Sequence, residues 1–424
     1  MQCSIMSIFH DIYNGIQDIC YIWREEMKQV FHDEGVIIFF FVVPLVYPLL
    51  YSWIYNNETV HEIPVVVVDD NHSSMSRKFI RMCDASPDVK IAFYAQDMDE
   101  AKSLVSRQLV KAVYYFPSDF DAKLNRMEQA TVGVYCDMSL MLAYKAAFQT
   151  AQLVSMQMGA EMKAKLGGYY TNREAAIATK PLDVADVPIF NPQGGYGSFV
   201  LPAVLVLILQ QTLVLGIGLS AGTTREKSRY GWLIPVSRHY HGLLRIVWGK
   251  ALCYFMIYAV MGVWLTMAVP RIFHFPQLAD GWTLLTLLLP YTLASIFFGM
   301  AVSCMVTYRE NVMLLMVFVS LPLLFLSGVS WPLSNIPAFW QGAAWMFPST
   351  FAIRAYVRLN SMGASISDVM TEYNMLWVHT IFYFFVACTV YYVQMSRARR
   401  GTLDRLAQKK QSADDVEDDS IDTK

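Results

Sequence analysis

Residues 36–55, VIIFFFVVPLVYPLLYSWIY, form an apolar stretch without a single charged side chain. A helix rises about 1.5 Å per residue, so about 20 apolar residues cross a hydrocarbon core roughly 30 Å thick. Unpaired backbone groups are costly in lipid, and a single segment satisfies them only as a helix. This stretch therefore predicts a first transmembrane helix.

Five further stretches of similar length also lack Asp, Glu, Lys and Arg: residues 198–221, 251–270, 282–307, 312–330 and 376–395. Hydrophobic residues make up 55% of the chain and charged residues only 16%, whereas soluble domains usually carry about a quarter charged residues. The formal net charge of -2 gives no general attraction to nucleic acid. The sequence thus predicts a polytopic α-helical membrane protein with six spans.

Basic residues set the expected orientation. The segment 222–250 carries six lysines and arginines against one acid, and more basic residues follow the sixth span at residues 397–410. The loops on the other side are poorer, with Arg271 in one and Arg354 and Arg358 in another. By the positive-inside rule, both termini lie in the cytoplasm and the insert at 56–197 lies outside.

The first 35 residues predict an amphipathic helix, because apolar residues recur at spacings of three and four from Ile12 to Val30. Two interpretations remain open for this helix. It packs on protein as an ordinary cytoplasmic helix, or it lies in the membrane interface and leads into the first span. The tail at 396–424 is acidic toward its end and poor in apolar residues, so we expect it to be disordered.

The insert at 56–197 predicts an extracytoplasmic α/β domain, because β-rich runs alternate with helical patterns. Its two cysteines, Cys83 and Cys136, would be able to form a disulfide there. The expected strands are 63–68, 90–94, 112–116 and 131–135, and the expected helices are 76–83, 97–110 and 140–166.

Two segments outside the uncharged stretches carry distinctive residues. Residues 225–237, REKSRYGWLIPVS, combine charges with a Gly turn, an aromatic-apolar patch and a proline, and they lead to Gly249 and Lys250. A plain basic loop that only sets topology is the alternative. Residues 325–337, FLSGVSWPLSNIP, interrupt an apolar run and begin a re-entrant or external segment at 331–375. The alternative there is a simple exit loop with an interfacial tryptophan.

Signatures of catalysis are absent from the sequence. Gly249-Lys250 lacks the other residues of a phosphate-binding loop, and no nucleophile elbow, HExxH or dinucleotide fingerprint occurs. The cysteines show no metal-ligand spacing, and His239 and His241 are better explained as interfacial residues than as metal ligands. Because the uncharged spans carry no Asp, Glu, Lys or Arg for ion coupling, uphill transport would need energy from another subunit.

These features together resemble the membrane subunit of type-2 ABC exporters, in the branch with a large external domain between spans one and two. The resemblance covers roughly residues 10–396 and depends on the order and spacing of several short motifs. One departure from the family pattern lies at residues 230–234, YGWLI. The motifs are residues 69–73 (DDNHS), 116–120 (FPSDF), 190–192 (FNP), 199–202 (FVLP), 225–237 with 249–250, and 325–337.

The resemblance implies a permease, not an enzyme, that exports an amphipathic or hydrophobic molecule such as a drug, a lipid-like compound or a toxin. It implies an ABC ATPase partner that binds ATP and Mg²⁺, and a second permease copy as homodimer or paralogous heterodimer. A periplasmic adaptor and an outer-membrane channel are further expected partners, and the inner (plasma) membrane is the expected location. A non-transporting receptor or scaffold with a ligand-binding external domain is the alternative function, and a membrane-embedded enzyme is a third.

The resemblance also implies roles for particular residues, and Glu226 is the best single candidate for the ATPase contact. The implied ATPase-coupling residues are Arg225, Glu226, Tyr230, Gly231, Trp232, Leu233, Pro235, Gly249 and Lys250. The implied motif residues at the mouth of the second span and in the external segment are Asn191, Pro192, Pro202, Ser327, Gly328, Trp331, Pro332 and Pro337.

Overall fold

A computed structural model shows the chain as two compact units. The helical unit comprises Met1–Asn56 and Ile189–Lys424, and the inserted unit comprises Asn57–Pro188. This division agrees with the predicted insert between the first two spans. The structure describes residues 2–126, 128–167, 171, 173–174, 177, 189–192, 194–227, 242–305 and 308–421.

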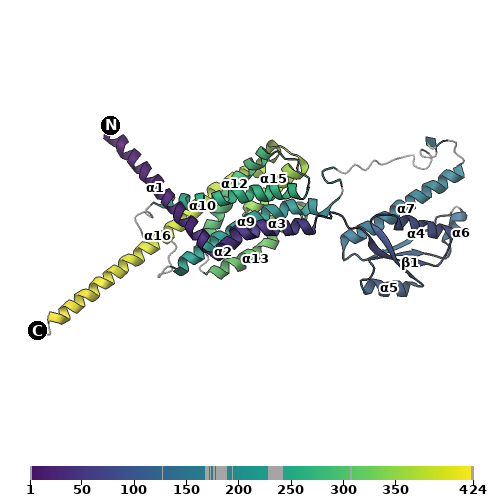
Figure 1. The fold of residues 1–424 in the computed structure, drawn as a ribbon, viewed down its shortest axis with the longest axis horizontal. Coiled ribbons are helices and arrows are strands. Elements are labelled where there is room, and N and C mark those ends of the chain that lie inside the picture. Colours follow the sequence, from purple (N-terminus) through teal and green to yellow (C-terminus); the bar gives the residue numbers. More distant parts are fainter. Residues whose placement is uncertain are drawn as a thin grey trace. The chain divides into compact units, whose positions relative to one another are not determined.

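The helical unit begins with α1 (Gln2–His32), α2 (Glu34–Ile37) and α3 (Val43–Ile54), and a π-helical turn at Ile38–Val42 joins the last two (Figure 1). The helices that follow the insert are α9 (Tyr196–Lys227), α10 (Leu243–Val263), α11 (Val269–Ile272), α12 (Gly281–Met305), α13 (Arg309–Leu326), α14 (Ala338–Ala344), α15 (Pro348–Met362) and α16 (Met370–Ile421). A second π-helical turn lies at Trp264–Ala268, and 3-10 turns lie at Leu333–Asn335 and Ile366–Val369.

Among the described residues, six helical stretches are long and apolar enough to cross a membrane, and each overlaps one predicted span. The structure is therefore consistent with a polytopic helical membrane protein with six candidate spans. Several of these helices extend beyond the uncharged sequence, so that charged residues such as Arg245 and Lys250 lie within their ends. The stretches are Glu34–Ile54, Tyr196–Glu226, Leu243–Ile272, Gly281–Ser303, Arg309–Leu326 and Ile366–Ala398.

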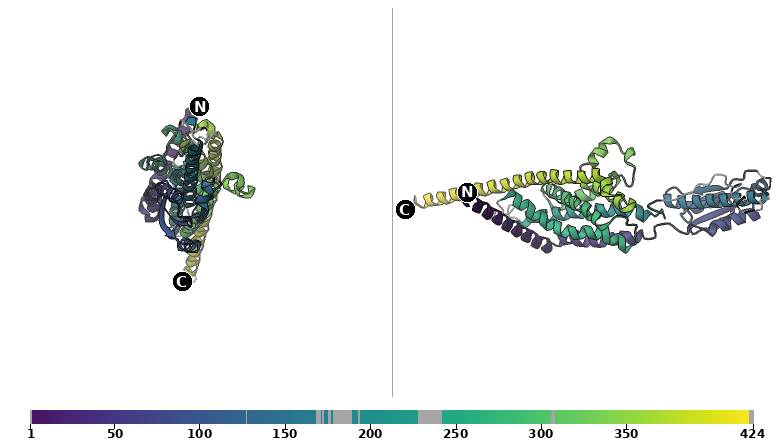
Figure 2. Two further views of the ribbon diagram at one scale, coloured as in Figure 1. Left: turned by 90° about the vertical axis from the view of Figure 1, so that its right-hand side faces the viewer. Right: turned by 90° about the horizontal axis from the view of Figure 1, so that it is seen from above.

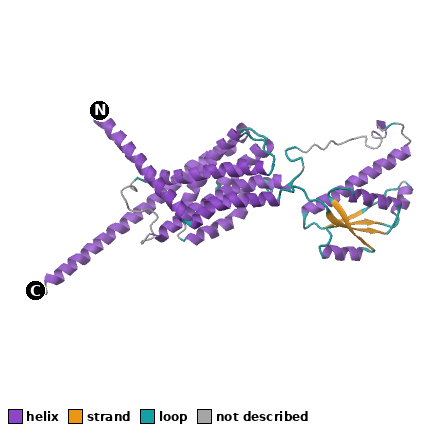
Figure 3. Ribbon diagram, viewed as in Figure 1, coloured by secondary structure: helices purple, strands orange, loops and turns teal. Residues whose placement is uncertain are grey.

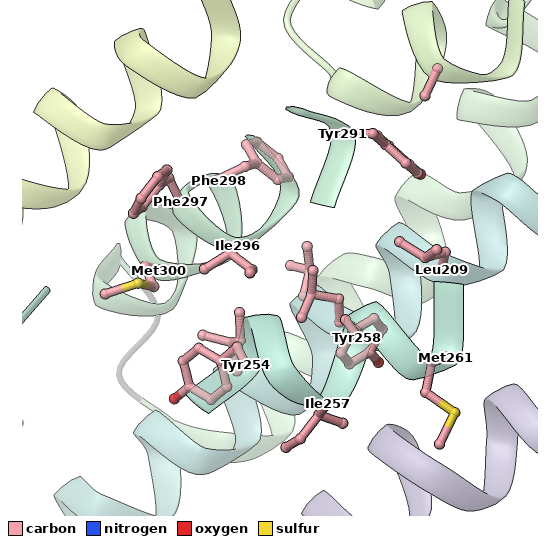
Figure 4. Packing of buried hydrophobic residues seen from close by; sticks show 14 of the residues in the cluster. Leu209, Tyr254, Ile257, Tyr258, Met261, Tyr291, Ile296, Phe297, Phe298 and Met300 are labelled. Atoms are coloured by element: carbon pink, nitrogen blue, oxygen red, sulfur yellow. The ribbon is translucent and has the colours of Figure 1, made fainter. Parts of the chain in front are cut away.

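Helix α9 is the central helix of this unit. Its apolar window is 89% buried, whereas that of α13 is only 18% buried. α9 packs against α3, α12, α13 and α15. Figure 4 shows the core where Leu209 of α9, Tyr258 and Met261 of α10 and Tyr291 of α12 lie close together. A span that is apolar on all sides and buried fits a helix surrounded by other helices.

Both π-helical turns precede a proline by the same offset. Pro44 follows the first turn and Pro270 follows the second. Proline clashes with the carbonyl four residues earlier and leaves it without its helical partner, and a local widening of the helix accommodates this. For Pro270 that carbonyl belongs to Thr266. It accepts hydrogen bonds from the Tyr356 hydroxyl at 2.8 Å and the Gln277 amide at 3.0 Å.

Within the segment 331–375, predicted to be re-entrant or external, the structure contains a helix, α15, that the sequence analysis did not anticipate. α15 is packed against α9, α12 and α16, and most of its residues are buried. Its first turn begins with Pro348, which is well suited to a helix start. The next amide, that of Ser349, donates to the side chain of Gln210 on α9 at 2.7 Å. The segment is therefore part of the helical core.

The expectation of a disordered tail differs from the structure. α16 continues without interruption through Met395 to Ile421, and Figure 2 shows this helix, in yellow, running past the bundle. Residues 396–421 are rich in Ala, Arg, Leu, Gln and Lys, which are good helix formers. Extending an existing helix avoids the unfavourable nucleation step, so this composition continues the last span as a helix.

The inserted unit is an α/β layer structure, and it contains all the strands that the structure describes (Figure 3). β1 (Ile63–Asp69), β2 (Val89–Ala95) and β3 (Ala112–Phe116) are parallel, and β4 (Gly133–Cys136) pairs antiparallel to β3. The sheet order is β2-β1-β3-β4. The helices are α4 (Ser74–Asp84), α5 (Met98–Ser106), α6 (Phe120–Asn125) and α7 (Met141–Gly167).

Helices cover both faces of the sheet. Val65 and Val67 of β1 pack with α4 and α7, whereas Val66 and Val68 pack with Ala101 of α5. A parallel strand that is covered on both faces is continuously apolar, which explains the run of valines. All four strands lie close to the predicted positions, and α6 is an additional helix. Cys83 and Cys136 are free thiols in the structure, not a disulfide.

Candidate functional site

One side of α1 carries polar groups that bind it to the ends of α9, α10 and α13. Glu26 is 3% exposed, and its carboxylate is paired with the ammonium of Lys250 on α10. The hydroxyls of Tyr254 and Ser220 also donate to this carboxylate. A buried charge is stable only when it is paired and hydrogen-bonded, and Glu26 satisfies both conditions. This group joins α1 to α9 and α10.

Asp33, between α1 and α2, makes a second connection. Its carboxylate accepts from the backbone amides of Gly35 at 3.0 Å and Val36 at 3.3 Å, and so caps α2. It also accepts from Arg309 of α13 at 2.9 Å and from the hydroxyl of Thr223 of α9. Burial raises the pKa of Asp33, but the bonds from Thr223 and Val36, the charge of Arg309 and the bond from Gly35 together hold it below its usual value.

The backbones of α1 and α10 also lie close together beside these polar contacts. A Cβ at Gly249 would lie 2.9 Å from side-chain atoms of Ile22, so only glycine lets α10 lie this close to α1. Asp18 and Arg245 form an ion pair at 2.7 Å along the same contact. α1 is thus attached both to the end of α9 and to the start of α10.

The predicted ATPase-coupling residues fall into three groups. Glu226 is exposed at the end of α9, whereas Arg225 beside it is buried. Gly249 and Lys250 face α1, so their visible contacts are internal to the chain. The remaining residues lie outside the described part of the chain: Tyr230, Gly231, Trp232, Leu233 and Pro235.

Sequence reasoning did not identify Glu26. It stands four residues after Ile22 and four before Val30, and both of these apolar side chains are fully buried. Residues four apart share one face of a helix, so Glu26 lies on the apolar face. An acid on that face was the available signal, but its partner is 224 residues away in the sequence.

A cavity of about 370 Å³ lies between α3, α9 and α13. Four tyrosines follow one another along it from α3 to the start of α9. The ring centroids of Tyr47 and Tyr51 are 4.6 Å apart, those of Tyr51 and Tyr55 are 6.1 Å apart, and those of Tyr55 and Tyr196 are 5.5 Å apart. Such rings offer a large apolar surface with hydroxyl groups at its edge.

Gln211 of α9 is the unusual member of this cavity wall. Its side chain is 8% exposed, and neither atom of its amide has a hydrogen-bond partner among the described residues. An unsatisfied buried amide is costly, and native structures usually satisfy such groups. The described residues of the cavity wall include no Asp, Glu, Lys, Arg or His. The arrangement suits an apolar ligand with a polar group that pairs with Gln211.

Only some of the predicted motif residues at the other end of α9 lie close together in the structure. Asn191, Ser327 and Gly328 line a common cavity of about 500 Å³, although Asn191 is more than a hundred residues from the other two in the sequence. Gly328 has a φ of +90°, a conformation that favours glycine, and so ends the turn after α13. The other motif residues do not line this cavity: Pro192, Pro202, Trp331, Pro332 and Pro337.

Comparison with known proteins agrees with the arrangement of spans and insert. The family described as "ABC-2 family transporter protein" matches residues 35–389, which is most of the chain. No curated protein matches the chain. The match begins at the first span and ends inside the last one. The chain therefore belongs to the ABC-2 family of transporter proteins and is a membrane permease of that family.

Proposed function

We propose that this permease exports an amphipathic or hydrophobic molecule, and that the cavity between α3, α9 and α13 is where the molecule binds within the membrane region. The observation that carries the proposal is Gln211, a buried amide without a partner in an otherwise apolar, uncharged cavity. A ligand with one hydrogen-bonding group would satisfy that amide, and its apolar body would contact the tyrosines. The resemblance to type-2 exporters supports the outward direction.

The energy for this movement comes from a separate ATPase subunit that binds ATP and Mg²⁺. The uncharged cavity wall supports this, because a transporter driven by ions usually has ionisable groups beside its substrate. The ATPase docks on the exposed end of α9 and on the segment that follows it. Closure of its nucleotide sites then moves α9, α10 and α1 together through Glu26 and Lys250.

A second permease copy covers the side of the unit where α3 and α13 lie. These two spans are the least buried of the six, at 28% and 18%, so lipid or protein must cover them. Because both helices line the cavity, a second copy at this side would close it. The inserted unit lies outside the cytoplasmic membrane, where an adaptor and an outer-membrane channel would reach it. This placement is supported by the distribution of basic residues.

The test is co-purification of the permease with its ATPase in mild detergent, followed by reconstitution in liposomes. ATP-dependent transport of daunorubicin, a fluorescent amphipathic drug, is measured together with ATP hydrolysis. Leu324→Trp fills the cavity, and we expect it to reduce transport at least several-fold. Leu289→Trp is the matched control, because Leu289 is an exposed residue of α12 that neither lines the cavity nor lies on α3 or α13.

Gln211 gives a second, more specific variant for the same assay. Gln211→Leu removes the unpaired amide, and it should change the concentration of drug that gives half-maximal stimulation of ATP hydrolysis. Basal hydrolysis should remain. If Leu324→Trp and Leu289→Trp transport equally well, export through this cavity is excluded. If no ATPase copurifies, a receptor or scaffold role becomes the better explanation.

A further inference from the structure

The second cavity, about 500 Å³ in volume, is lined by α15, the start of α9 and the turn after α13. Phe199 in its wall stands 24 residues before Thr223, which contacts Asp33 at the other end of α9. At about 1.5 Å per residue these positions lie roughly 36 Å apart, which is close to the thickness of a hydrocarbon core. The cavity therefore lies at the membrane boundary opposite to the α1 contacts.

The described residues around this cavity carry more positive than negative charge. Arg354, Arg358 and Glu372 are the charged residues among the described residues that line it. Arg358 is paired with Glu372 at 3.1 Å and also donates to the carbonyl of Asp368 at 2.7 Å. Arg354 has no acidic partner among the described residues, and its Nε donates to the carbonyl of Ser327 at 3.1 Å. The described wall thus has two guanidinium groups and one carboxylate, and the half-buried Arg354 is the arginine that forms no ion pair.

Polar atoms of Arg354 and Glu372 in the wall lack hydrogen-bond partners among the described residues. The terminal nitrogens of Arg354 make no hydrogen bond to the described residues, although a guanidinium has five N–H donors. One carboxylate oxygen of Glu372, Oε2, is buried and also has no partner in the described part of the chain. Donors for an anion therefore lie in the same cavity as an acceptor for a hydroxyl or amine.

Apart from Asn191 and three serines, the other described residues of the wall are glycine or apolar residues. Phe190, Phe199, Val357 and Met362 surround the charged groups. A small inorganic anion would leave this apolar surface uncovered, whereas an amphiphile would fill it with its chain. Burial lowers the pKa of Arg354 and the charge of Glu372 opposes that shift, but a guanidinium stays protonated in proteins. The positive charge is therefore permanent.

We infer that this cavity binds an amphiphile whose headgroup carries one phosphate or carboxylate beside a hydrogen-bond donor. The anion pairs with Arg354, the donor satisfies Glu372, and the apolar chain contacts Phe199 and Met362. Two sources supply this chemistry: a resident anionic phospholipid of the outer leaflet, or a transported molecule on its way out. Binding itself does not depend on the proposed function, and only the choice between the sources does.

The test measures binding of dioctanoyl phosphatidylglycerol and dioctanoyl phosphatidylcholine to the full-length protein in neutral detergent by native mass spectrometry. Phosphatidylglycerol has a net negative charge and free hydroxyls, and phosphatidylcholine has neither. We expect Arg354→Gln to weaken phosphatidylglycerol binding about tenfold or more, the effect of losing one charge-assisted interaction, and to leave phosphatidylcholine unchanged. Arg271→Gln is the matched control, because Arg271 is an exposed arginine at the same end that does not line the cavity.

A second variant guards against loss of folding in Arg354→Gln. Ser361→Asp adds a negative charge to the wall and keeps every bond of Arg354, so it should also abolish the preference for phosphatidylglycerol. Equal binding of the two lipids by the unchanged protein, or an unchanged preference in Ser361→Asp, would overturn the inference. With the ATPase bound, phosphatidylglycerol retained during ATP hydrolysis identifies a resident lipid, and its loss identifies a transported ligand.

Discussion

The carboxylate of Glu26 on α1 is paired with the ammonium of Lys250 on α10, and both side chains are almost completely buried. Removing one partner of a buried ion pair leaves an uncompensated charge, which typically costs about 3–5 kcal/mol, whereas replacing both with apolar groups is often tolerated. This pair therefore makes the attachment of α1 sensitive to either single substitution.

We expect Lys250→Met to lower the free energy of unfolding by about 3–5 kcal/mol, seen as a lower melting temperature in detergent. The double variant Glu26→Gln, Lys250→Met should recover much of that loss. Lys28→Met is the control, because Lys28 pairs with Glu25 on the exposed side of α1, where such pairs contribute at most about 1 kcal/mol. Equal melting temperatures for Lys28→Met and Lys250→Met would contradict the buried pair.

The second prediction concerns Glu226 at the exposed end of α9. Glu226→Ala should leave the fold intact and lower permease-dependent ATP hydrolysis several-fold, because the proposed contact with the ATPase loses its charged group. Glu310→Ala is the matched control, because Glu310 is also an exposed glutamate, in the first turn of α13. Full activity of Glu226→Ala in the copurified complex would remove this residue from the ATPase contact.

The spans and strands were predictable because a dominant local constraint fixes each of them. Lipid leaves residues 36–55 no alternative to a helix, and the valines of β1 fit a strand covered on both faces. α15 was missed because Arg354, Arg358 and Asn360 give it the composition of an external loop. Its helical structure depends on tertiary burial against α9 and on Gln210, which holds the amide of Ser349.

The candidate sites were less predictable because their residues are distant in sequence. The family resemblance implied that Lys250 contacts a partner protein, whereas the structure pairs it with Glu26, 224 residues earlier. Gln210 and Gln211 are adjacent and chemically identical, yet one caps α15 and the other lies unpaired in a cavity. The two glutamines differ only in the side of α9 on which they lie, and the orientation of α9 about its axis in the bundle cannot be predicted from the local sequence.

The third prediction follows from Asp33. Its pKa in the folded chain lies below the ordinary 3.8, so the unfolded chain binds more protons between these two values. The stabilisation by Asp33 is complete above the ordinary pKa and is lost as the pH falls through the lower, folded value. Melting temperature should thus decline from pH 5 to pH 3 more steeply in the unchanged protein than in Asp33→Asn. Parallel declines would show that Asp33 does not contribute.

The fourth prediction tests the placement of the inserted unit by thiol labelling in intact cells. Burial raises the pKa of Cys83 to about 12, with the charge of Asp84 adding to the shift, and burial also raises the pKa of Cys136. Thiolates are the reactive form, so the two thiols should react slowly with a membrane-impermeant maleimide at neutral pH. Asp99→Cys introduces a thiol at a side chain that is 90% exposed in the same unit.

With Cys3 and Cys304 replaced by serine, Asp99→Cys should be labelled in intact cells within minutes. Cys20 is the internal control, because it is exposed on α1, and the positive-inside rule places α1 in the cytoplasm. It should be labelled only after the membrane is permeabilised. If the thiol at position 99 also requires permeabilisation, the inserted unit lies in the cytoplasm, and an adaptor on the far side of the membrane has nothing to bind.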